Sequence, residues 1–107
     1  MANQEPDVKI TPRVTYKVAT HEELEKPYRV IIQNDDVTPM DFVILVLQMI
    51  FGLDTNRAVA IMYEAHYNGR AHVVTLPFEE AQERIYDAHS LAREVDYPLT
   101  FYLEPDE

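Results

Sequence analysis

YRVIIQNDDVTPMDFV, residues 28–43, combines a strand pattern, an acidic turn and a helix start in one short stretch. The β-branched run Val30–Ile32 favours a strand. Pro39 is typical of the first position of a helix. Thr38 is expected as the N-cap of that helix, with Asp41 completing a near capping box in place of the usual Glu. The chain is therefore predicted to pass from a strand, through a turn of acids, directly into a helix.

Apolar spacing, with glycine and proline as boundaries, predicts the other elements. Gly52 is expected to end the first helix and Gly69 the second. The predicted elements are a strand at 28–34, helices at 38–51 and 55–68, a strand at 71–76, a helix at 78–96 and a strand at 99–104. The order β-α-α-β-α-β predicts an α+β fold, in which three helices pack on a small antiparallel three-stranded sheet.

The chain of 107 residues is long enough for one small domain. Residues 1–26 hold five acidic and four basic residues, two prolines and little periodicity, which predicts a flexible N-terminal extension. Residues 27–107 are predicted to be the core domain. They hold fourteen acidic and five basic residues, so most of the formal net charge of −10 belongs to the folded part.

The acidic charge argues against nucleic acid and against an anionic membrane surface as partners. The sequence has no cysteine, which fits a reducing compartment. The N-terminus has no apolar signal core, and no stretch of about 18 apolar residues is present to span a bilayer. We therefore expect a cytoplasmic protein without a membrane anchor.

The acidic turn offers more acceptors than helix capping requires. If Thr38 answers the free N–H groups of the helix, then Asn34, Asp35 and Asp36 form a cluster suited to an ammonium group or a metal ion. His66 is expected on the apolar stripe of the second helix, one turn after Met62. The imidazole, the thioether and the acids are therefore predicted to meet at a pocket with a polar mouth and an apolar interior.

Plainer interpretations of the same residues stay open. The acids can simply favour a turn, and a histidine near a helix C-terminus can simply favour the helix dipole. The other histidines, His21, His72 and His89, are expected on the extension, a strand face and a solvated helix face. No glycine-rich phosphate loop and no Ser or Cys nucleophile beside a base is found, so catalysis is not expected.

The longer motifs carry a resemblance. NDDVTPMDFV at 34–43, AVAIMYEAHYNGRA at 58–71, EEAQER at 79–84 and YPLTFYLE at 97–104 appear in order, and the stretch from Tyr28 to Glu104 resembles the ClpS family. These proteins are adaptors that hand N-degron substrates to a Clp-family AAA+ unfoldase. The resemblance implies binding of a free α-amino group together with the side chain of an N-terminal Leu, Phe, Tyr or Trp.

Position by position, the resemblance also implies roles for residues. The α-amino group would be bound by Asn34, Asp36 and His66, with Asp35 beside them. The side-chain pocket would be lined by Ile32, Thr38, Met40, Val43, Met62, Ala65 and Leu99. Glu79 and Arg84 would contact the N-terminal domain of a ClpA-like or ClpC-like unfoldase. The extension would serve delivery of the substrate. No cofactor, metal or enzymatic activity is implied.

Two alternatives to this adaptor function remain at this point. Asp35, Asp36 and His66 could instead serve a metal-binding or metal-dependent hydrolytic domain. The predicted element order also resembles the C-terminal domain of the ribosomal stalk protein, which would make the chain a purely structural interaction domain.

Overall fold

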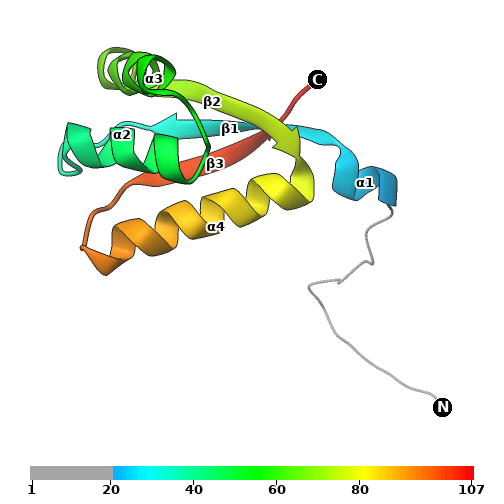
Figure 1. The fold of residues 1–107 in the computed structure, drawn as a ribbon. Helices are drawn as coiled ribbons and strands as arrows, with labels where there is room; N and C mark the ends of the chain where they lie inside the picture. The colour runs from blue at the N-terminus through cyan, green and yellow to red at the C-terminus, as the bar shows by residue number, and fades with distance from the viewer. Residues whose placement is uncertain (1–20) are drawn as a thin grey trace.

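The computed structural model describes residues 21–107, so most of the predicted N-terminal extension lies outside the described residues. The elements are α1 (His21–Glu25), β1 (Pro27–Gln33), α2 (Met40–Met49), α3 (Thr55–Asn68), β2 (Arg70–Pro77), α4 (Phe78–Glu94) and β3 (Thr100–Pro105). The predicted order β-α-α-β-α-β is confirmed from β1 to β3 (Figure 1).

The sheet is antiparallel with the strand order β2-β1-β3, so β1 lies in the centre. Val30 is opposite Val74 on one side and Leu103 on the other, and the pairing with β2 shifts between Val30 and Ile31. The centre of β1 is inaccessible to solvent, with Val30, Ile31 and Ile32 at most 2% exposed. A central strand with neighbours on both edges, whose side chains are buried on both faces, favours such a continuous β-branched run. The predicted α+β fold with a three-stranded antiparallel sheet is confirmed.

Most of the core lies where the helices pack on the sheet. Figure 1 shows α4 running along the sheet, with α2 and α3 packed together at the other side of the same core. Three alanines of α4, Ala81, Ala88 and Ala92, are fully buried and recur at helical spacing. Their small side chains let α4 pack closely against the core, which contains Val30, Ile32, Val46, Leu47, Ile61, Leu99 and Phe101.

The start of α2 differs from the prediction. Pro39, rather than Thr38, occupies the N-cap position, and no side chain caps the helix. The Thr38 N–H instead donates to Asp35 Oδ1 at 2.6 Å. The capping box expected from Thr38 and Asp41 is therefore wrong. Both the N–H and the hydroxyl of Thr38 donate to the Asp35 carboxylate within the turn instead.

The boundaries of α3 follow the prediction. Asp54 is the N-cap, and its Oδ1 accepts from the Arg57 N–H at 2.8 Å. Gly69 ends the helix with φ at +92°, a left-handed conformation that a glycine adopts without steric cost. Gly52, with φ at +70°, likewise terminates the turn after α2.

A short helix lies within the segment predicted to be extension. α1 contacts α4, and the Phe78 N–H donates to the Lys26 carbonyl at 3.0 Å. Apolar spacing did not predict this helix, which is too short for an apolar repeat. Across residues 21–107 no helix has the length and apolar character needed to cross a membrane.

Candidate functional site

A cavity of about 290 Å³ opens between the end of β1, the start of α2 and the exposed end of α3. Every residue predicted for the amine site and for the side-chain pocket lines it: Ile32, Asn34, Asp35, Asp36, Thr38, Met40, Val43, Met62, Ala65, His66 and Leu99. Gln33, Val37 and Pro39 complete the lining. The fold thus brings together residues that are up to 67 positions apart, from Ile32 to Leu99.

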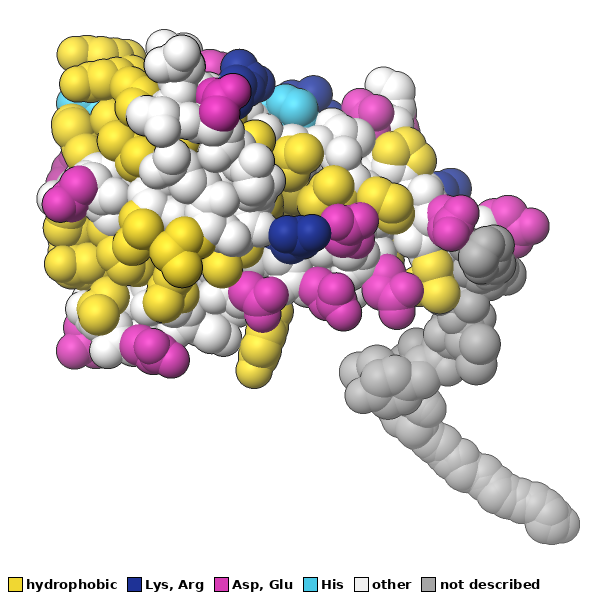
Figure 2. Space-filling view, viewed as in Figure 1, with side chains coloured by type: hydrophobic (Ala, Val, Ile, Leu, Met, Phe, Trp, Pro, Cys, Tyr) yellow, Lys and Arg dark blue, Asp and Glu magenta, His cyan; other side chains and the backbone are white. Residues whose placement is uncertain are grey.

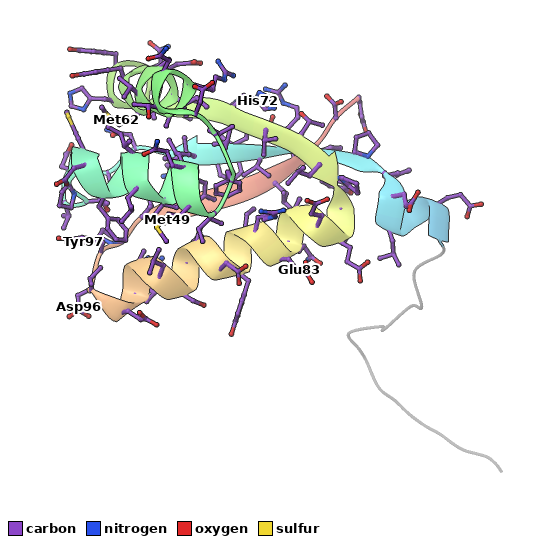
Figure 3. The ribbon with its side chains drawn as sticks, viewed as in Figure 1. Met49, Met62, His72, Glu83, Asp96 and Tyr97 are labelled. Carbon is purple, nitrogen blue, oxygen red and sulfur yellow. The ribbon has the colours of Figure 1, made fainter. Side chains whose placement is uncertain are left out.

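The floor of the cavity is apolar. Ile32, Val43, Met62, Ala65 and Leu99 are between 1% and 8% exposed. They come from β1, α2, α3 and the segment before β3, and Figure 3 shows Met62 on the side of α3 that faces α2. An apolar side chain placed in this cavity would exchange water for hydrocarbon contacts.

The rim of the cavity is polar because the turn after β1 is tied to the end of α3. The Asn34 N–H donates to the Gly69 carbonyl at 2.9 Å. This bond holds Asn34 and its neighbours beside the last turn of α3, where His66 lies. Acids and a histidine that are distant in sequence therefore share one rim, and the structure here follows the expectation of a polar mouth over an apolar interior.

The two acids of the turn have different environments. Asp35 accepts hydrogen bonds from the Val37 N–H at 2.8 Å, from the Thr38 N–H at 2.6 Å and from the Thr38 hydroxyl at 2.9 Å. These bonds shape the turn. The Asp36 carboxylate is exposed and has no hydrogen-bond or ion-pair partner within residues 21–107. Asp36 is consequently the carboxylate available to a cationic ligand.

His66 lies at the rim rather than among the buried residues of α3. The residues expected to share its stripe, Ala58, Ile61, Met62 and Ala65, are buried, whereas His66 is exposed. The stripe prediction for His66 is wrong in this respect: the neighbouring Ala65 is buried in the same helical turn, whereas His66 lies on the cavity rim. The imidazole borders the cavity from above and packs against the Tyr67 ring, with centroids 5.0 Å apart.

A metal site at this rim is not supported by the geometry. In the described part of the chain, no three His, Cys, Asp or Glu side chains are grouped to hold one metal ion. Asp35, moreover, already uses both carboxylate oxygens within the turn. The metal-dependent alternative built on Asp35, Asp36 and His66 therefore finds no supporting arrangement.

Glu79 and Arg84, predicted to contact an unfoldase, lie on α4 and do not line the cavity. Glu79 is exposed. Arg84 is half-buried: its Nη1 donates to the Ile50 carbonyl at 2.7 Å, and its Nη2 lies 3.0 Å from Glu80 Oε2. Arg84 thus joins α4 to the end of α2, a structural contact that the sequence did not reveal.

His89 was expected on a solvated helix face, and this prediction is wrong. Its Nε2 accepts a hydrogen bond from the Phe101 N–H of β3 at 3.0 Å. Burial, together with the nearby Arg93 guanidinium, lowers the pKa of His89. Because β3 is an edge strand, its outward N–H groups need partners, and His89 supplies one of them.

The aromatic surroundings of His66 were likewise not predicted from the sequence. Tyr63 and Tyr67 of α3 are exposed, and their rings stack with centroids 6.1 Å apart. The available signal was their i, i+4 spacing on either side of His66. Figure 2 shows hydrophobic side chains gathered at the left end of the molecule, over the ends of α2 and α3, with a histidine among them.

Comparison with known proteins identifies close relatives of this chain. The family model of the ATP-dependent Clp protease adaptor protein ClpS matches residues 23–102. The ATP-dependent Clp protease adapter protein ClpS of Erwinia tasmaniensis is 42% identical over 85 residues, which cover 78% of this chain and 80% of the relative. The protein of the same description from Cronobacter sakazakii is 44% identical over 77 residues, covering 72% and 73% of the two chains.

A solved structure gives the same result for the fold. Agrobacterium tumefaciens ClpS2 bound to L-phenylalaninamide superimposes with a TM-score of 0.74 at 35% sequence identity, covering 77% of this chain and 99% of that one. Sequence and structure therefore agree over the part of the chain that forms the cavity.

Proposed function

Because the chain belongs to the ClpS family of Clp protease adaptors, we propose that its cavity binds the free N-terminus of substrate proteins for delivery to a Clp-family AAA+ unfoldase. The observation that carries this proposal is the arrangement of the cavity, where the Asp36 carboxylate, which has no partner among residues 21–107, and His66 border an apolar floor. A peptide N-terminus has the matching chemistry, an ammonium group one bond from the carbon that carries the first side chain.

The amine site consists of Asp36, Asn34 and His66. The exposed Asp36 carboxylate and the Asn34 side-chain carbonyl accept from the ammonium group, and a ring nitrogen of His66 offers a further acceptor. Hydrogen bonds to a charged group contribute about 1.5 to 3 kcal/mol each. Asp35 contributes by holding the turn in place through its bonds to Val37 and Thr38.

The apolar floor binds the side chain of the first residue and selects for apolar ones. Burial of a Leu or Phe side chain is worth about 1.5 to 3 kcal/mol. Neither the floor nor the amine site is sufficient alone, so the combination selects N-terminal Leu, Phe, Tyr or Trp that is not blocked. The ligand of the Agrobacterium protein, L-phenylalaninamide, has this chemistry, with a free α-amine and an aromatic side chain.

Delivery requires a partner surface outside the cavity. We assign it to the exposed side of α4, which includes Glu79 and lies away from the cavity lining. The partner would be the N-terminal domain of a ClpA-like or ClpC-like unfoldase, with residues 1–26 assisting transfer of the substrate. The protein acts in this proposal as a cytoplasmic adaptor without enzymatic activity.

The amine site is tested with two peptides that begin with Leu, one free and one Nα-acetylated. Acetylation removes the positive charge and two donors, so we expect the affinity to fall at least tenfold, about 1.4 kcal/mol, in calorimetric titrations. Asp36→Asn should weaken binding of the free peptide. The matched control is Asp41→Asn, because Asp41 is an exposed acid of the adjacent helix turn that does not line the cavity. Equal affinity for both peptides would contradict the proposal.

The role of the extension is tested separately with a chain that begins at His21 and so keeps α1. The deletion removes no cavity residue, and we expect degron peptides to bind it normally. Degradation of an N-degron reporter by the cognate unfoldase and peptidase should fail. Normal degradation would show that the first twenty residues are dispensable for delivery.

A further inference from the structure

Tyr63 and Tyr67 form an exposed aromatic pair beside the cavity. Their side chains are 45% and 76% exposed, and the rings stack with an interplanar angle of 15°. The Tyr67 ring also meets the His66 ring edge-on, at 78°. Since His66 borders the cavity, the aromatic surface is continuous with the cavity rim.

The core does not account for this pair. Neither ring belongs to the buried cluster of residues or to the partly buried residues packed against it. Neither hydroxyl has a hydrogen-bond partner within the part of the chain that the structure describes. Large aromatic side chains usually bury most of their area, so two that stay exposed next to a ligand cavity indicate a contact surface for the ligand.

We propose that Tyr63 and Tyr67 are a second subsite, which binds the side chain of the third residue of the N-degron and favours an apolar aromatic ring there. This proposal rests on the proposed function. With the amine at Asp36 and the first side chain in the cavity, the peptide leaves through the mouth past His66.

The spacing of an extended peptide selects the third residue. Successive side chains of an extended chain point to opposite sides, so the first and third lie on the same side, roughly 6.6 Å apart. The Tyr67 ring lies 5.0 Å from the His66 ring at the rim, and the Tyr63 ring, one helical turn nearer the start of α3, lies 6.1 Å from the Tyr67 ring. A third side chain that turns back toward the protein on the α3 side therefore meets the tyrosines, whereas the second points away.

The test compares tripeptide amides that begin with Leu: Leu-Gly-Gly, Leu-Gly-Phe and Leu-Phe-Gly, with leucinamide as a ligand that reaches only the cavity. We expect Leu-Gly-Phe to bind about threefold to tenfold more tightly than Leu-Gly-Gly, the range of an added aromatic contact. Leu-Phe-Gly should show no such gain.

Variants then assign the gain to the tyrosines. Tyr67→Ala and Tyr63→Ala should each reduce it, and Tyr67→Phe should keep it because the ring rather than the hydroxyl makes the contact. The matched control is Tyr86→Ala, which removes a tyrosine that is 72% exposed on α4. Because Tyr67 also contacts His66, Tyr63→Ala isolates the subsite from the amine site, and leucinamide affinity reports any disturbance of His66.

The outcomes separate this inference from the function on which it rests. If leucinamide and all three tripeptides fail to bind, the proposed function is wrong. If leucinamide binds but Leu-Gly-Phe and Leu-Gly-Gly bind equally, the subsite does not exist. A gain that persists in both alanine variants, or that appears with Phe at the second position, would also overturn it.

Discussion

Replacement of Arg84 by alanine separates a structural role from a role in partner binding. The guanidinium joins α4 to the C-terminal end of α2 through the Ile50 carbonyl, and it pairs with Glu80 one turn away. A loss of unfoldase binding in an Arg84 variant is therefore interpretable only when its effect on stability is known. We expect Arg84→Ala to lower the free energy of unfolding.

The size of the loss follows from these contacts. A hydrogen bond from a charged donor contributes about 1.5 to 3 kcal/mol. The Arg84 side chain is 41% exposed, so water competes for the guanidinium and about half of that value is expected. The Glu80 pair at i, i+4 spacing adds about 0.3 to 0.5 kcal/mol. The expected loss is about 1 to 2 kcal/mol.

Urea denaturation followed by circular dichroism measures this loss. The midpoint should fall by roughly 1 M without a change in the m-value, given m near 1 to 2 kcal/mol/M for a small domain. Glu80→Gln is the matched control, since it removes only the ion pair and should cost no more than about 0.5 kcal/mol. A loss below about 0.3 kcal/mol in Arg84→Ala would refute the argument that Arg84 fastens α4 to α2.

Further predictions concern the cavity and the pH dependence of stability. Met40 is 42% exposed at the start of α2 and borders the cavity mouth. Met40→Ala should therefore admit peptides with N-terminal Ile or Val and weaken Leu binding about twofold to threefold. Unchanged selectivity in a peptide panel would count against this role of Met40. Ala65 is 3% exposed in the cavity floor, and Ala65→Val should penalise N-terminal Trp by about 1 to 3 kcal/mol while Leu is still bound, as titration would show. The pKa of His89 is lowered in the folded state, so its contribution to stability is complete above the reference pKa of 6.5 and is lost as the pH falls through the folded-state pKa. The difference in urea midpoint between pH 7.5 and 5.5 should therefore be smaller in His89→Gln than in the unaltered protein. Equal differences would show that His89 does not contribute to the pH dependence of stability.

Local features of the structure could be predicted from the sequence because neighbouring residues produce them. The ends of α3 follow from Asp54, which caps the helix with its own side chain, and from Gly69, which adopts a left-handed conformation. The β-branched centre of β1 predicted that strand, and the helix at 78–96 was predicted to begin after Pro77, where α4 begins. The resemblance to the ClpS family implied all the residues that line the cavity apart from Gln33, Val37 and Pro39.

Contacts between distant segments were decided only by the tertiary structure. The family resemblance distinguishes Asp36 from Asp35 without giving a reason, and the structure supplies one: Asp35 accepts hydrogen bonds within the turn, whereas Asp36 has no partner within residues 21–107. His89 looked solvated because its helix spacing does not show that an N–H of the edge strand β3 lies opposite. The sequence likewise does not show that the Arg84 guanidinium meets the Ile50 carbonyl at the end of α2. For His89 and Arg84, the environment of the side chain is set by a backbone group elsewhere in the chain, whose position depends on how the elements pack.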